Sequence, residues 1–137
     1  FKNLNLENTD ISIRLLSNLC AKYDIKSDVI IESKQIHPLS KFKKAGFYIS
    51  YWLPSFHYLK SIFNIFKIKN DLIEFKPDVI SMPYSSVSFY SKKFPNYPIH
   101  CWTNGMVGED DKLRIENLSK IQSVRIILTD FKENFLK

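Results

Sequence analysis

"FKPDVISMPYSS", residues 75–86, contains the end of one helix, a whole strand and the start of a second helix. Pro77 ends the first helix, because its ring clashes with the carbonyl group four residues earlier. The run "DVISMP" is short, apolar and β-branched, which is typical of a strand buried on both faces of a parallel sheet. Ser85 and Ser86 follow, and serine is favoured at the start of a helix. The stretch therefore predicts an α/β unit with a hydroxyl-rich loop at the carboxyl end of its strand.

The same alternation of helix and strand extends in both directions from this stretch. It predicts an α/β domain, a Rossmann-like parallel sheet of four or five strands with helices on both faces. Residues 34–55 are less regular, with a basic patch and an aromatic cluster. The predicted helices are 8–25, 55–76, 85–94, 109–121 and a last one starting at 130, and the predicted strands are 27–33, 78–83, 99–103 and 124–129.

The size and composition of the chain indicate one globular domain, residues 1–137, with a formal net charge of +6. The longest uncharged run, residues 45–59, is shorter than the roughly 20 residues that a membrane span needs. Residues 1–10 are polar and acidic, so no secretory signal is predicted. We therefore expect a cytoplasmic protein in which Cys20 and Cys101 are buried free thiols.

The loops that follow the strands are the first place to expect a site. In open parallel sheets, ligands bind beyond the carboxyl ends of the strands. That rule selects four loops: 33–34, 83–86, 103–108 and 129–130. Free backbone N–H groups at a helix start suit an anionic or hydroxyl-rich ligand. The alternative is that Ser85 and Ser86 only cap the helix that they begin.

The segments "FKPDVISMP", "PNYPIHCWTNG" and "SVRIILTDFKENFLK" together resemble the N-terminal half of GT-B glycosyltransferases. The family in question is the large retaining one that includes sucrose synthases and many lipopolysaccharide and capsule enzymes. There, a "kPDvI" strand is followed by a helix, a second strand, an acidic helix and a segment with a small hydroxyl residue. The resemblance covers residues 70–137 in pattern and residues 8–33 in the order of elements.

The resemblance implies a role on the acceptor side of a sugar transfer. A nucleotide-sugar would be the donor substrate, a cell-surface glycan or lipid-linked molecule the acceptor, and no cofactor or metal is expected. The donor would mostly bind a second domain beyond Lys137, so this chain alone should be inactive. Asp78, which opens its strand, would be structural. The residues implied in acceptor binding are Tyr84, Ser85, Ser86, Thr103, Asn104, Gly105 and Thr129.

Two departures from the family pattern leave the catalytic residues unassigned. Residues 1–20 contain no glycine, so the family's glycine-rich first loop has no match. The histidine that often ends the third strand is replaced by Thr103 or Asn104, and His100 lies inside the strand.

The other ionisable residues are expected to have structural roles. Acidic residues 109–111 suit the positive end of a helix dipole better than a metal or a catalytic base. His37 and His57 have no partner at a meaningful spacing and are expected to be surface or packing residues.

Lysines and aromatic residues interleave between residues 41 and 69. Such a segment can rest on an anionic membrane surface, with its aromatic rings at the level of the headgroups. The residues expected to make this contact are Lys41, Lys43, Lys44 and Trp52. The alternative is a core helix after a loop. Nucleic acid is not an expected partner, because no RNA- or DNA-binding motif accompanies the charge.

Two other functions stay open at this point. One is a non-enzymatic Rossmann-like domain that binds or senses a ligand, and the other is a scaffold at a membrane. A second α/β domain downstream of Lys137, with a basic residue and paired glutamates, would favour transfer.

Overall fold

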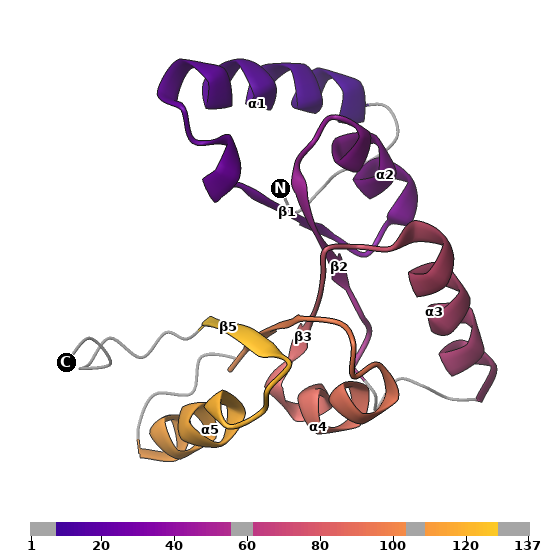
Figure 1. The fold of residues 1–137 in the computed structure, drawn as a ribbon, viewed down its shortest axis with the longest axis vertical. Helices are drawn as coiled ribbons and strands as arrows, with labels where there is room; N and C mark the ends of the chain where they lie inside the picture. The colour runs from indigo at the N-terminus through magenta and orange to yellow at the C-terminus, as the bar shows by residue number, and fades with distance from the viewer. Residues whose placement is uncertain (1–7, 56–61, 104–108, 129–137) are drawn as a thin grey trace.

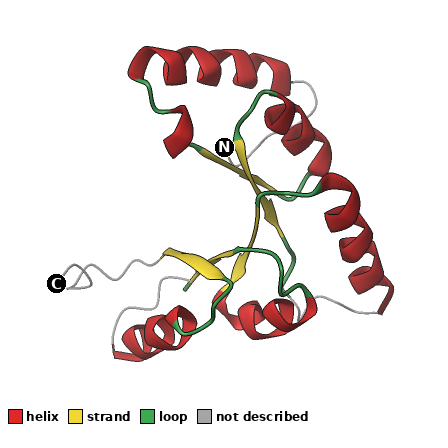
Figure 2. Ribbon diagram, in the orientation of Figure 1, coloured by secondary structure: helices red, strands yellow, loops and turns green. Residues whose placement is uncertain are grey.

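The computed structural model describes residues 8–55, 62–103 and 109–128. Strands and helices alternate along this part of the chain (Figures 1 and 2). The helices are α1 (Thr9–Tyr23), α2 (Ile36–Lys44), α3 (Ile62–Phe75), α4 (Tyr84–Lys93) and α5 (Glu109–Ser119), with one 3-10 turn at Lys26–Asp28. The strands are β1 (Ile30–Ser33), β2 (Tyr48–Trp52), β3 (Val79–Pro83), β4 (Ile99–Trp102) and β5 (Val124–Leu128).

The five strands form one sheet in which every neighbouring pair is parallel. The predicted class, an α/β domain with a parallel sheet flanked by helices and consistent with a Rossmann-like fold, is confirmed. The expected helices on both faces differ from the structure, because the described helices pack their apolar side chains into one cluster on one face. The stretch 75–86 folds as its pattern indicates, because α3 ends at Phe75 and α4 begins directly after β3. All five residues of β3 are buried.

The strand order in the sheet is β1-β2-β3-β4-β5, the same as the order along the chain. Crossovers between parallel strands are right-handed, so connections that always step in one direction place their helices on one face. In Figure 1 the helices follow one another along an arc around the strands. The buried apolar cluster contains alternate strand residues, among them Ile31, Ile49, Ile80 and Ile99, together with Phe42 and Tyr90 of the helices.

The other set of alternate strand residues forms what we call the second face of the sheet. The parallel register places these side chains together: Ile30, Glu32, Tyr48, Ser50, Trp52, Val79, Ser81, Pro83, His100, Trp102, Ile126 and Leu128. None of them belongs to the apolar cluster, although Val79 is fully buried. The described helices therefore pack their apolar side chains against one face, and the second face has a different, mixed polar and aromatic composition.

Asp78 joins the start of β3 to β2, the structural role expected of it. Its Oδ2 accepts a hydrogen bond from the Ile49 backbone N–H at 2.8 Å, and its own N–H donates to the Ile49 carbonyl at 3.1 Å. Lys43 lies 4.0 Å from the other carboxylate oxygen. Because a buried backbone N–H needs a partner, the side chain fixes the register of the two strands at this point.

Both cysteines are buried free thiols, as the sequence predicts. Burial raises the pKa of the Cys101 thiol to about 11. The thiolate is the reactive form of cysteine, so Cys101 is chemically inert at neutral pH.

Candidate functional site

The carboxyl edge of the sheet, where the strands end, holds the loops that the sequence selects. At β3 the chain passes from Pro83 straight into α4, and no side chain caps the helix start. The first turn of a helix carries N–H groups without partners inside the helix. This edge therefore offers hydrogen-bond donors where parallel sheets usually bind ligands.

The structure separates the predicted acceptor-binding residues into accessible and buried ones. Ser85 is exposed and Tyr84 is half-buried, with the Arg114 guanidinium 4.7 Å from the centre of its ring. Ser86 is buried, and its hydroxyl lies 3.5 Å from that of Ser55. Thr103 is also buried, and its N–H donates to the Leu128 carbonyl at 3.1 Å.

The remaining three predicted site residues, Asn104, Gly105 and Thr129, lie outside the described residues. The part of the edge that can be described therefore consists of the ends of β1 to β5, the start of α4 and the side of α5 that carries Arg114.

Two tryptophans meet at this edge. Trp52 ends β2 and Trp102 ends β4, and their rings stand edge to face with centres 5.3 Å apart. The Lys34 ammonium lies 4.0 Å from the centre of the Trp52 ring, in a cation–π contact. The sequence predicts membrane contact for Trp52 and no site role for Trp102. The sequence carries no direct signal for the pair, because residues 34–55 are expected to be irregular and the predicted strand 99–103 ends one residue after Trp102.

Polar side chains line the second face next to this pair. Ser81 and Ser50 are fully buried there, and the Ser50 hydroxyl donates to Glu32 Oε2 at 3.1 Å. His100 is 6% exposed, and its ring stacks on Tyr48 with centres 6.3 Å apart. Burial lowers the pKa of His100, and the Glu32 carboxylate opposes this shift. His100 is therefore neutral at pH 7 and can both donate and accept a hydrogen bond.

The residues expected at a membrane do not form one surface. Lys41 pairs with Asp10 at 2.8 Å, and Lys43 donates to the Lys76 carbonyl. Both lysines belong to the last turn of α2, at the amino edge of the sheet, where the strands begin. Lys44 in the same turn is exposed, whereas Trp52 lies at the opposite, carboxyl edge. The basic and the aromatic parts of the predicted contact are thus separated by the length of β2.

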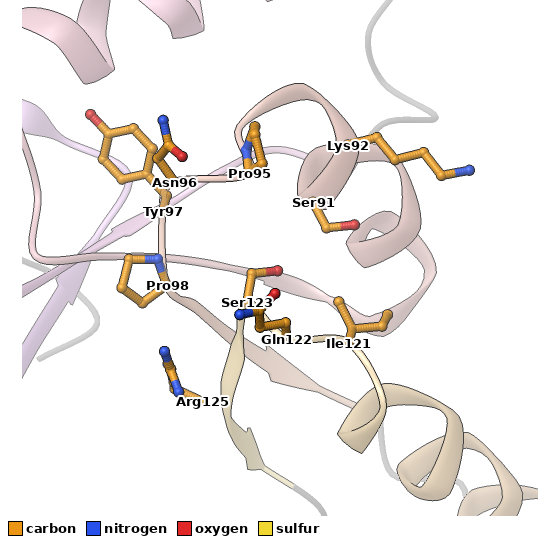
Figure 3. A pocket seen from close by; sticks show the side chains of 10 residues that line it. All are labelled: Ser91, Lys92, Pro95, Asn96, Tyr97, Pro98, Ile121, Gln122, Ser123 and Arg125. Atoms are coloured by element: carbon orange, nitrogen blue, oxygen red, sulfur yellow. The ribbon is translucent and has the colours of Figure 1, made fainter.

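Two open hollows also lie at the amino edge. One, of about 560 Å³, is bounded by the α4–β4 and α5–β5 connections, and Lys92, Asn96 and Arg125 are among its side chains (Figure 3). The other, of about 550 Å³, is lined by residues that include Lys26 and Lys43. Lys26 already donates to the Ala45 carbonyl at 2.7 Å. Neither hollow reaches the strand ends that bind ligands in this kind of sheet, so we take the carboxyl edge as the candidate site.

Within the described residues, no group of three His, Cys, Asp or Glu side chains is arranged to hold a metal ion. No helix in the same part of the chain is long and apolar enough to cross a membrane. Comparison of the chain with protein-family models, with curated proteins and with solved structures finds no match.

Proposed function

We propose that this chain binds a carbohydrate at the carboxyl edge of its sheet, as the acceptor-side domain of a GT-B-type glycosyltransferase. The observation that carries the proposal is the Trp52–Trp102 pair at the ends of β2 and β4, beside the uncapped start of α4. Aromatic rings offer a flat apolar surface to the C–H face of a sugar ring. Neighbouring polar groups can then select its hydroxyls.

The chemistry available at this edge suits positioning. Ser85 and the start of α4, which no side chain caps, can bond to sugar hydroxyls, and Arg114 and Lys34 lie beside aromatic rings. Holding the acceptor hydroxyl in place makes an intermolecular reaction effectively intramolecular, which is a large catalytic effect. The nucleotide-sugar and its leaving diphosphate would be bound by another domain, so this chain alone turns over no donor.

A non-enzymatic carbohydrate-binding domain is the second candidate. It is favoured by the groups that lie against Trp52 or at the start of α4, which are Lys34, Tyr84, Ser85 and Arg114. A general base for deprotonating an acceptor hydroxyl is usually a histidine or a carboxylate. These four side chains include neither, so binding without catalysis fits them equally well.

The proposal also includes a cytoplasmic location and contact with an anionic membrane surface. The net charge of +6 supports the membrane contact. Since Lys41 and Lys43 are engaged within the chain, the contact should be weak and electrostatic. Sedimentation with phosphatidylserine vesicles, compared with phosphatidylcholine vesicles, tests it. Equal sedimentation with both would argue against this part of the proposal.

Titration of the 137-residue chain with methyl glycosides and short oligosaccharides, followed by calorimetry, tests the main proposal. We expect binding that Trp52→Ala and Trp102→Ala each weaken. Phe66→Ala, at an aromatic residue that is 57% exposed on α3, is the matched control and should bind like the parent chain. Absence of binding to every sugar would refute the proposal.

Donor turnover separates the two candidates. Release of nucleotide from a panel of nucleotide-sugars is measured with the 137-residue chain and with a longer protein that contains it. Sugar binding together with turnover only in the longer protein supports glycosyl transfer. Sugar binding without turnover in either protein supports the binding domain.

A further inference from the structure

Two aromatic contacts cross strand β3 on the second face of the sheet. Trp52 of β2 meets Trp102 of β4, and Tyr48 of β2 stacks on His100 of β4. These side chains can meet because β3, which lies between the two strands, carries small residues on this face. Its small side chains there are Val79, Ser81 and Pro83. The pattern creates a narrow strip along β3 that is spanned by aromatic rings from both sides.

Ser81 lies at the centre of this strip, and the hydrogen-bonding capacity of its hydroxyl is unused. It is paired in register with Trp52 on one side and with His100 on the other. The residue is 0% exposed, and within the described part of the chain its hydroxyl has no hydrogen-bond partner. Buried polar groups are nearly always paired, so an unpaired one requires an explanation. Ser50, the other buried serine of this face, does have a partner, because its hydroxyl donates a hydrogen bond to Glu32.

The aromatic side chains that flank the strip are less buried than the β3 side chains between them. Tyr48 is 40% exposed, and Trp52 and Trp102 are half-buried. The tryptophan pair stands outside the apolar cluster, so separating the two rings opens no part of the core. A flat molecule that replaces the edge-to-face contact would therefore reach Ser81 without unfolding the sheet.

We propose that Ser81 and His100 form the polar floor of the carbohydrate site, reached by a sugar ring that lies against Trp52 and Trp102. This inference rests on the proposed function and extends its site from the edge onto the second face. The ligand class is a neutral pyranose. Its C–H face packs on an indole ring, and one of its hydroxyls bonds to the Ser81 hydroxyl and the neutral His100 imidazole.

The two tryptophans supply the probe for the experiment, because the chain contains no others. Intrinsic tryptophan fluorescence therefore reports only on this pair. The intact 137-residue chain is titrated with the methyl glycosides of glucose, galactose and N-acetylglucosamine, and calorimetry measures binding in parallel. We expect a change in fluorescence that saturates with the same dissociation constant as the heat signal.

Serine variants then locate the contact. Ser81→Ala should weaken sugar binding about tenfold, as expected for one lost hydrogen bond of about 1.4 kcal/mol. Ser91→Ala, which removes a hydroxyl on α4 bonded to the Ser88 carbonyl, should leave the affinity unchanged. His100→Gln keeps a donor and an acceptor and should retain more affinity than His100→Phe.

The outcomes distinguish this inference from the proposed function. A saturating change in fluorescence with Ser81→Ala as tight as the parent chain would leave the proposed function standing and overturn the inference. Binding by calorimetry with unchanged fluorescence would place the sugar away from Trp52 and Trp102 and overturn both. Absence of binding to all three glycosides and to the oligosaccharides would overturn both.

Discussion

The unpaired hydroxyl of Ser81 has a measurable consequence for stability, which is independent of any ligand. Ser81→Ala keeps the Cβ and removes only an oxygen that is buried and lacks a partner. Burying such a hydroxyl costs about 1–3 kcal/mol relative to leaving it in water. The void left behind is the size of one water probe, roughly 10–15 Å³, which costs about 0.3 kcal/mol at ~24 cal/mol per Å³. We therefore expect the free energy of unfolding to rise by about 1–2.5 kcal/mol.

Thermal and urea unfolding followed by circular dichroism measure this change. The unfolding entropy of about 2.1 cal/mol/K per residue, taken over 137 residues, converts the gain to a rise in Tm of roughly 3–9 °C. The urea midpoint should move with it while the slope stays constant.

Ser50→Ala is the matched control, because Ser50 is equally buried on the same face and its hydroxyl donates to Glu32 at 3.1 Å. Removing that paired hydroxyl should lower the free energy of unfolding by about 0.5–1.5 kcal/mol. The two substitutions thus have opposite expected signs. If Ser81→Ala destabilises the chain as much as Ser50→Ala does, the Ser81 hydroxyl has a partner in solution and the reasoning about the second face fails.

Three further predictions concern titrating groups and the start of β3. Burial lowers the pKa of His100, so the contribution of the neutral His100 to the free energy of unfolding should be full above pH 6.5 and be lost as the pH falls through the lowered pKa. His100→Gln should flatten this acid side of a plot of urea midpoint against pH. Burial and the bond to Asp71 raise the pKa of Tyr51 to about 12, so stability should fall between pH 10 and 12, and an unchanged alkaline limb in Tyr51→Phe would contradict this. Asp78→Ala leaves the Ile49 N–H without its side-chain acceptor and should cost about 1–3 kcal/mol in urea unfolding, whereas a loss below the error of the fit would show that the register is held elsewhere.

Local patterns of residues predicted most of the elements. The run "DVISMP" becomes β3 because short β-branched sequences between a proline and a serine pair have few other stable arrangements. The prediction of an irregular segment 34–55 is wrong, because these residues include α2 and β2. Pro38 falls in the first turn of α2, where a missing N–H costs nothing, so its presence did not exclude a helix. In β2 the aromatic residues on both faces hid the alternation of the strand.

The site was harder to predict, because it depends on which strands are neighbours. Trp52 and Trp102 are separated by a strand and two helices along the chain, and nothing in their spacing indicates contact. The order of strands in a parallel sheet depends on the path of each crossover, which buried apolar strands do not encode individually. The unpaired hydroxyl of Ser81 could be recognised only from the structure, because a serine within an apolar strand resembles any other small residue until its neighbours are known.

The sequential strand order also governs how the domain can assemble. Elements in close contact are mostly neighbours along the chain, so each strand-and-helix unit packs chiefly on the unit before it. Repeat proteins, in which each unit contacts only its neighbours, are the extreme case of such an arrangement, and there a folded unit offers a template to the next. Each pairing still closes a sizeable loop, as between Ile30 and Tyr48 or between Ser50 and Val79, and this entropy cost slows the folding of parallel sheets. The tryptophans belong to β2 and β4, so their contact can form only after three consecutive strands have joined, which makes it a marker for the joining of β2, β3 and β4.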